Sequence, residues 1–253
     1  MDTIETGYEA KFDFPFRDRP PMLSYLLASA PRSGSTLVSH LLWSTGCLGA
    51  PLEYLNFEPT GPYGFASESP VMQEALWRKV LTRRTSTNGV FGLKAFPVQM
   101  QGLSDSNPAL LVKVMRAMIA GRGRAKIVRL RRRDRTGHAI SYARAALSGV
   151  WRSEQEIGGR PEPEYSERAV VNAGRFIDQQ ENSWDEMIRD LDLAPLEIWY
   201  EDVLTDRAGA IEAVAGYLGV ELDRTATVQI PEIVRQSQRG ADAWRAAHGG
   251  RGA

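Results

Sequence analysis

The sequence has one cysteine, three histidines and no net charge, and each scarcity excludes a class of protein. Because Cys47 is the only cysteine, no disulfide can form within the chain and a cysteine-based zinc site is not expected. A protein without disulfides suits a reducing compartment. Lysine plus arginine and aspartate plus glutamate balance at 31 each, so no overall field favours nucleic acid or an anionic membrane.

Long hydrophobic runs are also missing. The longest run, residues 25–30, has the length of a strand rather than of a membrane-spanning helix. The acidic residues Asp2, Glu5 and Glu9 stand where a signal peptide would carry basic residues and an apolar core. We therefore expect a cytoplasmic protein with no membrane insertion and no nucleic-acid partner.

Short apolar runs alternate with helical periodicities along the chain. Strands are predicted over 24–29, 89–96, 125–130 and 196–200. Helices are predicted over 35–45, 68–84, 108–120, 135–150, 169–191 and 211–218. This alternation indicates an α/β fold with a mostly parallel sheet flanked by helices. No repeat or linker interrupts it, so we expect an extended arm over 1–21 and a single domain over 22–253.

The first predicted strand ends in the loop 31–36, Pro-Arg-Ser-Gly-Ser-Thr, where parallel sheets bind ligands. Gly34 lets the backbone approach a phosphate closely, and the amides at the helix start attract anions. Ser35 and Thr36 add hydroxyl donors, and Arg32 adds a forked cation. The lysine and first glycine of a nucleotide triphosphatase loop are absent. A simpler interpretation is a serine that only caps the helix.

Residues 28–37 (Ala-Ser-Ala-Pro-Arg-Ser-Gly-Ser-Thr-Leu) resemble the 5′-phosphosulfate loop of sulfotransferases that use 3′-phosphoadenosine 5′-phosphosulfate (PAPS). Residues 44–54 (Ser-Thr-Gly-Cys-Leu-Gly-Ala-Pro-Leu-Glu-Tyr) narrow the resemblance to the bacterial trehalose 2-sulfotransferase family. The resemblance implies a P-loop-like sulfotransferase fold, a homodimer, no metal, and transfer of a sulfuryl group from PAPS to a hydroxyl of a carbohydrate or similar acceptor. It also implies that the donor is bound by Arg32, Ser33, Gly34, Ser35 and Thr36.

Sulfotransferases hold the 3′-phosphate of PAPS with an arginine after a later strand and a serine on the next helix. The run Val-Arg-Leu-Arg-Arg-Arg-Asp over 128–134 and the stretch His-Ala-Ile-Ser-Tyr over 138–142 resemble those positions. The resemblance implies Ser141 as the hydroxyl ligand. The spacing in the narrower family selects Arg132 and the general spacing selects Arg133, so both remain candidates. Taken alone, the run would be a solvated basic turn.

Many cytosolic sulfotransferases use a histidine as the base. Here His40 and His138 fall in predicted helices, where each can simply be a helix-face residue, and His248 falls in the tail. In the trehalose-type family the carboxylate that matches Glu53 is the proposed base, although without the resemblance Glu53 would be a surface loop carboxylate. The resemblance therefore implies two catalytic residues: Glu53 as the base, and Arg32 to stabilise the charge on the departing 5′-phosphate.

The acceptor is the least defined part of the site. The segments expected to contact it, 56–69 and 149–165, match the family least, so a glycan, a glycolipid and a polar small molecule all remain open. Lys94 resembles a family lysine that either lines the pocket or lies along a strand end. The basic segment 235–239 resembles a family stretch that could close over the nucleotide. Three aromatic residues either stack on a sugar or belong to the core, namely Tyr54, Tyr63 and Trp151.

Two other classes of function compete with a sulfotransferase. One is another P-loop-type phosphate-handling enzyme, such as a nucleotide kinase, against which the missing loop lysine counts. The other is a non-catalytic nucleotide-binding protein that has kept an anion loop. Binding of PAPS rather than ATP, and transfer to a hydroxyl, separate the three.

Overall fold

A four-stranded sheet forms the centre of the computed structural model, which describes residues 5–119, 125–151, 161–232 and 238–249. All strands of this described sheet are parallel. In spatial order they are β2 (Val90–Ala95), β1 (Leu23–Ala28), β3 (Lys126–Arg131) and β4 (Leu196–Trp199). The predicted α/β class, with a parallel sheet flanked by helices, is confirmed.

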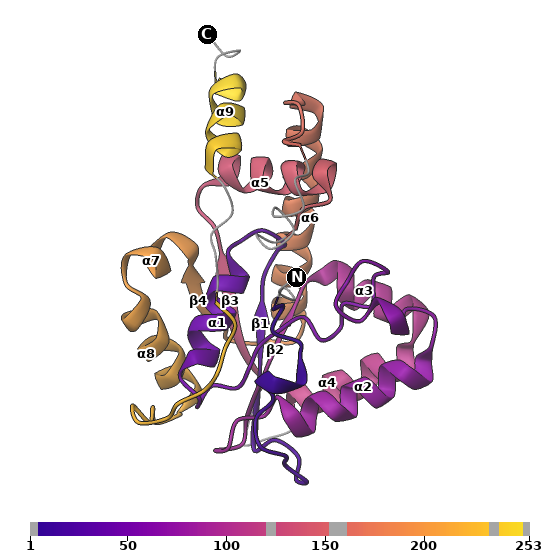
Figure 1. The fold of residues 1–253 in the computed structure, drawn as a ribbon, viewed down its shortest axis with the longest axis vertical. Coiled ribbons are helices and arrows are strands. Elements are labelled where there is room, and N and C mark those ends of the chain that lie inside the picture. Colours follow the sequence, from indigo (N-terminus) through magenta and orange to yellow (C-terminus); the bar gives the residue numbers. More distant parts are fainter. Residues whose placement is uncertain (1–4, 120–124, 152–160, 233–237, 250–253) are drawn as a thin grey trace.

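Helices cover both faces of the sheet (Figure 1). The helices on one face are α1 (Ser35–Ser44), α7 (Tyr200–Thr205) and α8 (Arg207–Leu218). Those on the other face are α2 (Pro70–Arg83), α3 (Pro97–Ser106), α4 (Pro108–Ile119) and α6 (Glu167–Asp190). Beyond the carboxyl ends of the strands, and in contact with each other, lie α5 (Arg135–Ser148) and α9 (Gln238–Gly249).

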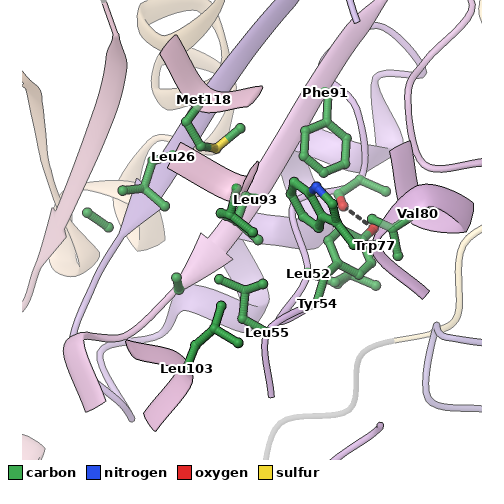
Figure 2. Close-up of a cluster of buried hydrophobic side chains, with 14 of the residues drawn as sticks. Leu26, Leu52, Tyr54, Leu55, Trp77, Val80, Phe91, Leu93, Leu103 and Met118 are labelled. Carbon is green, nitrogen blue, oxygen red and sulfur yellow. Dashed lines mark hydrogen bonds between the residues drawn. The ribbon is translucent and has the colours of Figure 1, made fainter. Parts of the chain in front are cut away.

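Alternation along the strands explains the two layers. In β1, Tyr25 and Leu27 pack with α1 and α8, whereas Leu26 belongs to the cluster on the opposite face. Figure 2 shows that second cluster, where Leu26 and Leu93 lie with Trp77 of α2. Because both faces are covered, β1 and β2 are largely apolar, whereas β3 also carries Lys126, Arg129 and Arg131.

Polar caps fix where several helices begin. The side chain of Ser69 accepts the N–H of Met72 at 3.3 Å at the start of α2. The Asp134 carboxylate accepts the N–H of Gly137 at 2.8 Å at the start of α5. Each bond satisfies an amide that helix geometry leaves without a partner.

Three helices were not predicted from the sequence: α3, α7 and α9. The first two are short and follow a strand directly, so no long periodic pattern announces them. Helix α9 lies in a polar segment that was interpreted as a tail, yet its Trp244 is buried and donates its indole N–H to the Pro163 carbonyl at 3.2 Å. This buried aromatic residue helps to attach the helix to the rest of the fold.

The segment before β1, predicted as an extended arm, contains a short 3₁₀ helix, Ala10–Phe12, and packs against the core through Phe12 and Phe14. Its backbone also pairs with the end of α2, since the N–H of Phe14 donates to the Arg83 carbonyl at 2.8 Å. The division into an arm over 1–21 and one domain over 22–253 stays a prediction. Within the described residues, no helix has both the length and the hydropathy needed to cross a bilayer.

Candidate active site

The anion loop lies between β1 and α1, and its backbone is tightly turned. Arg32 has a φ of 68° and Gly34 a φ of 90°, both in the left-handed region. A Cβ on Gly34 would lie 2.1 Å from the Tyr200 ring, so only glycine fits there. Gly34 is also the N-cap of α1 and supplies no side-chain cap to the helix amides. The helix start is therefore available to a bound anion.

Ser33 provides a second indication of a ligand site. Its side chain is fully buried, and its Oγ has no hydrogen-bond partner among the described residues. A buried hydroxyl without a partner costs free energy unless a ligand or water completes it. A phosphate or sulfate oxygen at the loop would supply that partner.

The structure brings Arg32 next to Ser141, a residue 109 positions away on α5. Arg32 Nε donates to Ser141 Oγ at 3.1 Å, and its guanidinium also donates to the carbonyl of Trp151. The loop after β1 and the helix after β3 therefore form one continuous polar surface. The sequence predicted that both would contact the same ligand.

Arg132 and Arg133 point in different directions. Arg132 Nη1 donates to the Arg32 carbonyl at 3.4 Å, and the central guanidinium carbon lies 5.3 Å from the centroid of the Tyr200 ring. Arg133 turns away, packs over Trp199 and pairs with Asp202 on the exposed side of α7. Of the two candidates, only Arg132 contacts the anion loop.

Glu53 lies in the loop after α1 and is largely buried, with 13% of its side chain exposed. Its Oε1 pairs with Lys94 Nζ at 3.0 Å. Its Oε2 accepts from Asn56 Nδ2 at 3.0 Å and from Gln99 Nε2 at 2.9 Å. Lys94, only 2% exposed, also donates to Thr36 Oγ1 at 3.3 Å, so one lysine links the carboxylate to the anion loop.

The sequence did not identify Gln99 or Tyr200 as parts of this site, and it included Asn56 only as the first residue of the expected acceptor segment 56–69. Gln99 is placed by the start of α3, where Pro97 follows Phe96, and that proline was an available helix-start signal. Nothing local marks Tyr200, because its contact with Gly34 joins residues far apart in the chain. Lys94 was left between two interpretations, and the structure places it inside the site rather than at a solvated strand end.

The three histidines have separate environments. His40 is buried edge-on against Trp43, and His248 of α9 shares a hydrogen bond with Tyr165 at 3.0 Å. His138 is fully buried, and its Nε2 lies 2.8 Å from the carbonyl oxygen of Pro31. Burial lowers the pKa of His138 to about 4, and nearby arginines act in the same direction. His138 is therefore neutral near pH 7 and supports the anion loop as a donor.

A pH-dependent stability follows from this histidine. Its pKa lies near 6.5 when unfolded and about 4 when folded, so between these values the unfolded chain binds more protons and stability falls as pH falls. The loss reaches about 3 kcal/mol at pH 4. Urea unfolding of His138→Gln at pH 7 and pH 4 should show a drop smaller by about that amount. An identical drop in both proteins would contradict the assignment.

A buried ion-pair network lies beneath the site. Arg129 on β3 is fully buried and pairs with Glu181 of α6, which also accepts from Arg131 Nε at 3.2 Å. Burial lowers the pKa of Arg129, and the Glu181 carboxylate opposes this effect. The network joins β3 to α6 and so fixes the strand end that carries Arg132.

The predicted acceptor segments are only partly described. Tyr54 is buried in the core, where its hydroxyl donates to the Ala50 carbonyl (Figure 2), and Tyr63 is buried in the same hydrophobic cluster. Trp151 is 37% exposed and packs edge-on against Tyr142. The stretch 152–160 lies outside the described residues.

The C-terminal basic segment is also only partly described, because residues 235–237 and the side chain of Arg239 lie outside the described part. Helix α9, which begins at Gln238 within this segment, packs against α5, the helix that carries Ser141. Its Arg245 pairs with Asp134 at 2.7 Å and, as the main cause, lowers the pKa of that carboxyl to about 2. Within the described residues, no group of three or more His, Cys, Asp and Glu side chains is arranged to hold a metal ion.

Residues 24–248 match the family model described as Stf0 sulphotransferase. Over 256 residues the chain is 26% identical to trehalose 2-sulfotransferase of Mycobacterium tuberculosis, covering 87% of this chain and 92% of that protein. It is 25% identical over 262 residues to trehalose 2-sulfotransferase of Mycolicibacterium smegmatis, with the same coverage.

Two solved structures show a weaker likeness. The sulfotransferase domain of the Synechococcus PCC 7002 olefin synthase is 14% identical with a TM-score of 0.48, covering 92% of this chain and 91% of that chain. A mouse sulfotransferase complexed with PAP is 15% identical with a TM-score of 0.43, covering 94% of this chain and 68% of that chain.

Proposed function

Since the chain belongs to the Stf0 sulphotransferase family and is therefore a sulfotransferase, we propose that it transfers a sulfuryl group from PAPS to a carbohydrate hydroxyl. Family membership decides against the nucleotide kinase and the non-catalytic binding protein. The choice of donor rests on the contacts of Arg32 with Ser141 and Arg132, which bring two candidate anion-binding segments together. A donor with two separate phosphate groups needs two such anchors.

The described residues fit this donor. The loop 32–36 offers the helix amides, the buried Ser33 hydroxyl and the Arg32 guanidinium to the 5′ end. Arg132 and Ser141 would take the 3′-phosphate, and Arg132 is preferred over Arg133 because Arg132 contacts the Arg32 carbonyl, whereas Arg133 pairs with Asp202 away from the loop. PAPS supplies an activated sulfuryl group, whose departure leaves negative charge on the 5′-phosphate. Arg32 and the loop amides would stabilise that charge.

Glu53 is the proposed base that accepts the proton of the acceptor hydroxyl. Lys94, Asn56 and Gln99 fix the orientation of its carboxylate, which reduces the reorganisation needed at the moment of reaction. Because Lys94 also contacts Thr36, it holds the base beside the anion loop. A hydroxyl bound between Glu53 and the donor would therefore meet both reacting groups at once.

The curated relatives are named for transfer to trehalose, and we extend to this chain only the broader class, a carbohydrate hydroxyl. Trehalose is the first acceptor to try, followed by a panel of glycans and glycolipids with labelled PAPS. A cytoplasmic location and a homodimer complete the proposal. The location is supported by the single, buried cysteine, and sedimentation of the purified protein tests the dimer.

Calorimetric binding of adenosine 3′,5′-bisphosphate tests the donor site. We expect Arg32→Ala and Arg132→Ala to weaken binding roughly 10- to 100-fold, because each removes a charge-assisted hydrogen-bond donor. Arg133→Ala is the matched control, one residue further along and paired with Asp202, and should bind within about twofold of wild type. No binding by the wild type would refute the donor, and equal losses for Arg132 and Arg133 would refute the choice between them.

A further inference from the structure

The segment before β1 lies outside the stretch matched by the family model, which begins at residue 24, yet it contacts the loop of Glu53. Arg84, whose side chain is 3% exposed, holds this segment in place. Its guanidinium donates to the carbonyl oxygens of Gly7 at 2.8 Å and Glu9 at 3.1 Å, and pairs with Asp13 at 3.0 Å. One buried arginine thus fixes the path of residues 7–13.

Packing and a local turn add to this attachment. Phe12 is 2% exposed and lies edge-on to Trp43, with ring centroids 5.9 Å apart. The Glu9 carboxylate accepts the backbone N–H groups of Thr6 and Gly7, both at 2.8 Å. The segment is therefore held on both sides of Tyr8.

Tyr8 connects this segment to the base. Its hydroxyl oxygen accepts the backbone N–H of Glu53 at 3.1 Å. Its ring lies edge-on to Tyr63 at 5.5 Å and to Tyr54 at 6.3 Å, which fixes the direction of the hydroxyl. Tyr8 thus sets the backbone of Glu53, while Lys94 and the two amides set its carboxylate.

We propose that Tyr8 is a positioning residue for Glu53, and that the segment before β1 helps to form the acceptor side of the site. This inference rests on the proposed role of Glu53 as the base. A hydroxyl to be deprotonated must lie within hydrogen-bond reach of the carboxylate, so a small shift of the Glu53 backbone changes the rate more than it changes binding.

Tyr8→Phe tests the proposal, because it keeps the ring and removes the hydroxyl that accepts the Glu53 N–H. We expect kcat to fall about tenfold with the acceptor that the wild type sulfates, with KM and the affinity for adenosine 3′,5′-bisphosphate within about twofold. We also expect faster hydrogen exchange at the Glu53 amide.

Tyr217→Phe is the matched control. The Tyr217 hydroxyl likewise accepts a backbone N–H, that of Ile127, at 3.1 Å, but at the start of β3 and away from the site. Its hydroxyl also donates to the Ala194 carbonyl at 2.9 Å, so this variant should lose at least as much thermal stability as Tyr8→Phe while keeping kcat. If Tyr8→Phe loses stability but keeps wild-type kcat and Glu53 exchange, Tyr8 is merely structural and the proposal is overturned.

The outcome is separable from the proposed function. If Glu53→Gln keeps full turnover, Glu53 is not the base and the proposed mechanism fails, whatever Tyr8→Phe does. If the wild type sulfates no carbohydrate, hydrogen exchange at the Glu53 amide is the measurement that tests the Tyr8 contact. Exchange in Tyr8→Phe that is at least about tenfold faster than in wild type and Tyr217→Phe supports the positioning contact, and unchanged exchange overturns it.

Discussion

Replacing Glu53 with glutamine is expected to lower turnover about 10²- to 10⁴-fold, the usual contribution of a side-chain base, while donor affinity stays within about twofold. Glutamine has the same shape and can still accept from Asn56 and Gln99, so the loop should keep its course. What is lost is the negative charge that pairs with Lys94 and receives the proton. Initial rates with labelled PAPS, and calorimetry with adenosine 3′,5′-bisphosphate, measure the two effects separately.

Glu58→Gln is the control for this experiment. Glu58 lies in the same loop but is exposed and within the expected acceptor segment 56–69, so removing its charge should leave donor affinity at the wild-type value and lower turnover far less than Glu53→Gln does. Wild-type turnover in Glu53→Gln would exclude Glu53 as the base. A parallel loss of donor affinity would instead indicate that the change had spread through Lys94 to Thr36.

Gly34→Ala is expected to weaken the binding of adenosine 3′,5′-bisphosphate about 100-fold. The new Cβ would lie 2.1 Å from the Tyr200 ring, and alanine is strained at a φ of 90°. The two effects together amount to roughly 2–4 kcal/mol, which must be met by moving the loop or the ring. Either movement displaces the amides that face the ligand.

Gly216→Ala provides the comparison. Gly216 lies in α8, has no atom within 4 Å of an added Cβ, and should tolerate alanine with unchanged binding and slightly higher stability. The double variant Gly34→Ala/Tyr200→Ala removes the steric contact but not the backbone strain, and should recover part of the affinity. Wild-type affinity in Gly34→Ala would show that the loop backbone does not approach the ligand.

Sequence patterns predicted the scaffold well because a buried parallel strand and an amphipathic helix each leave a local signature. All four described strands, and the start of α1 after Gly34, lie within about two residues of the predicted positions. The short helices α3 and α7 and the polar helix α9 leave no such signature. They are stabilised by contacts with distant residues, such as Trp244 with Pro163.

The candidate site shows the same division. The anion loop was visible because its residues are consecutive, and Ser141 because a resemblance pointed to it. The choice between Arg132 and Arg133 needed side-chain directions, which depend on where β3 ends and on the acids of α7. Glu53 contacts Lys94, Gln99 and Tyr8, which lie 41 to 46 positions away in the sequence. No local pattern encodes contacts over such separations.

The clamp formed by Arg84 also has a consequence for the order of assembly during synthesis. Gly7 is made before its partner Arg84, which follows 77 residues later, roughly 4–15 s at ordinary elongation rates. Ser141, the partner of Arg32, follows it by 109 residues, a still longer interval. In a growing chain the base side of the site can therefore close before the donor side.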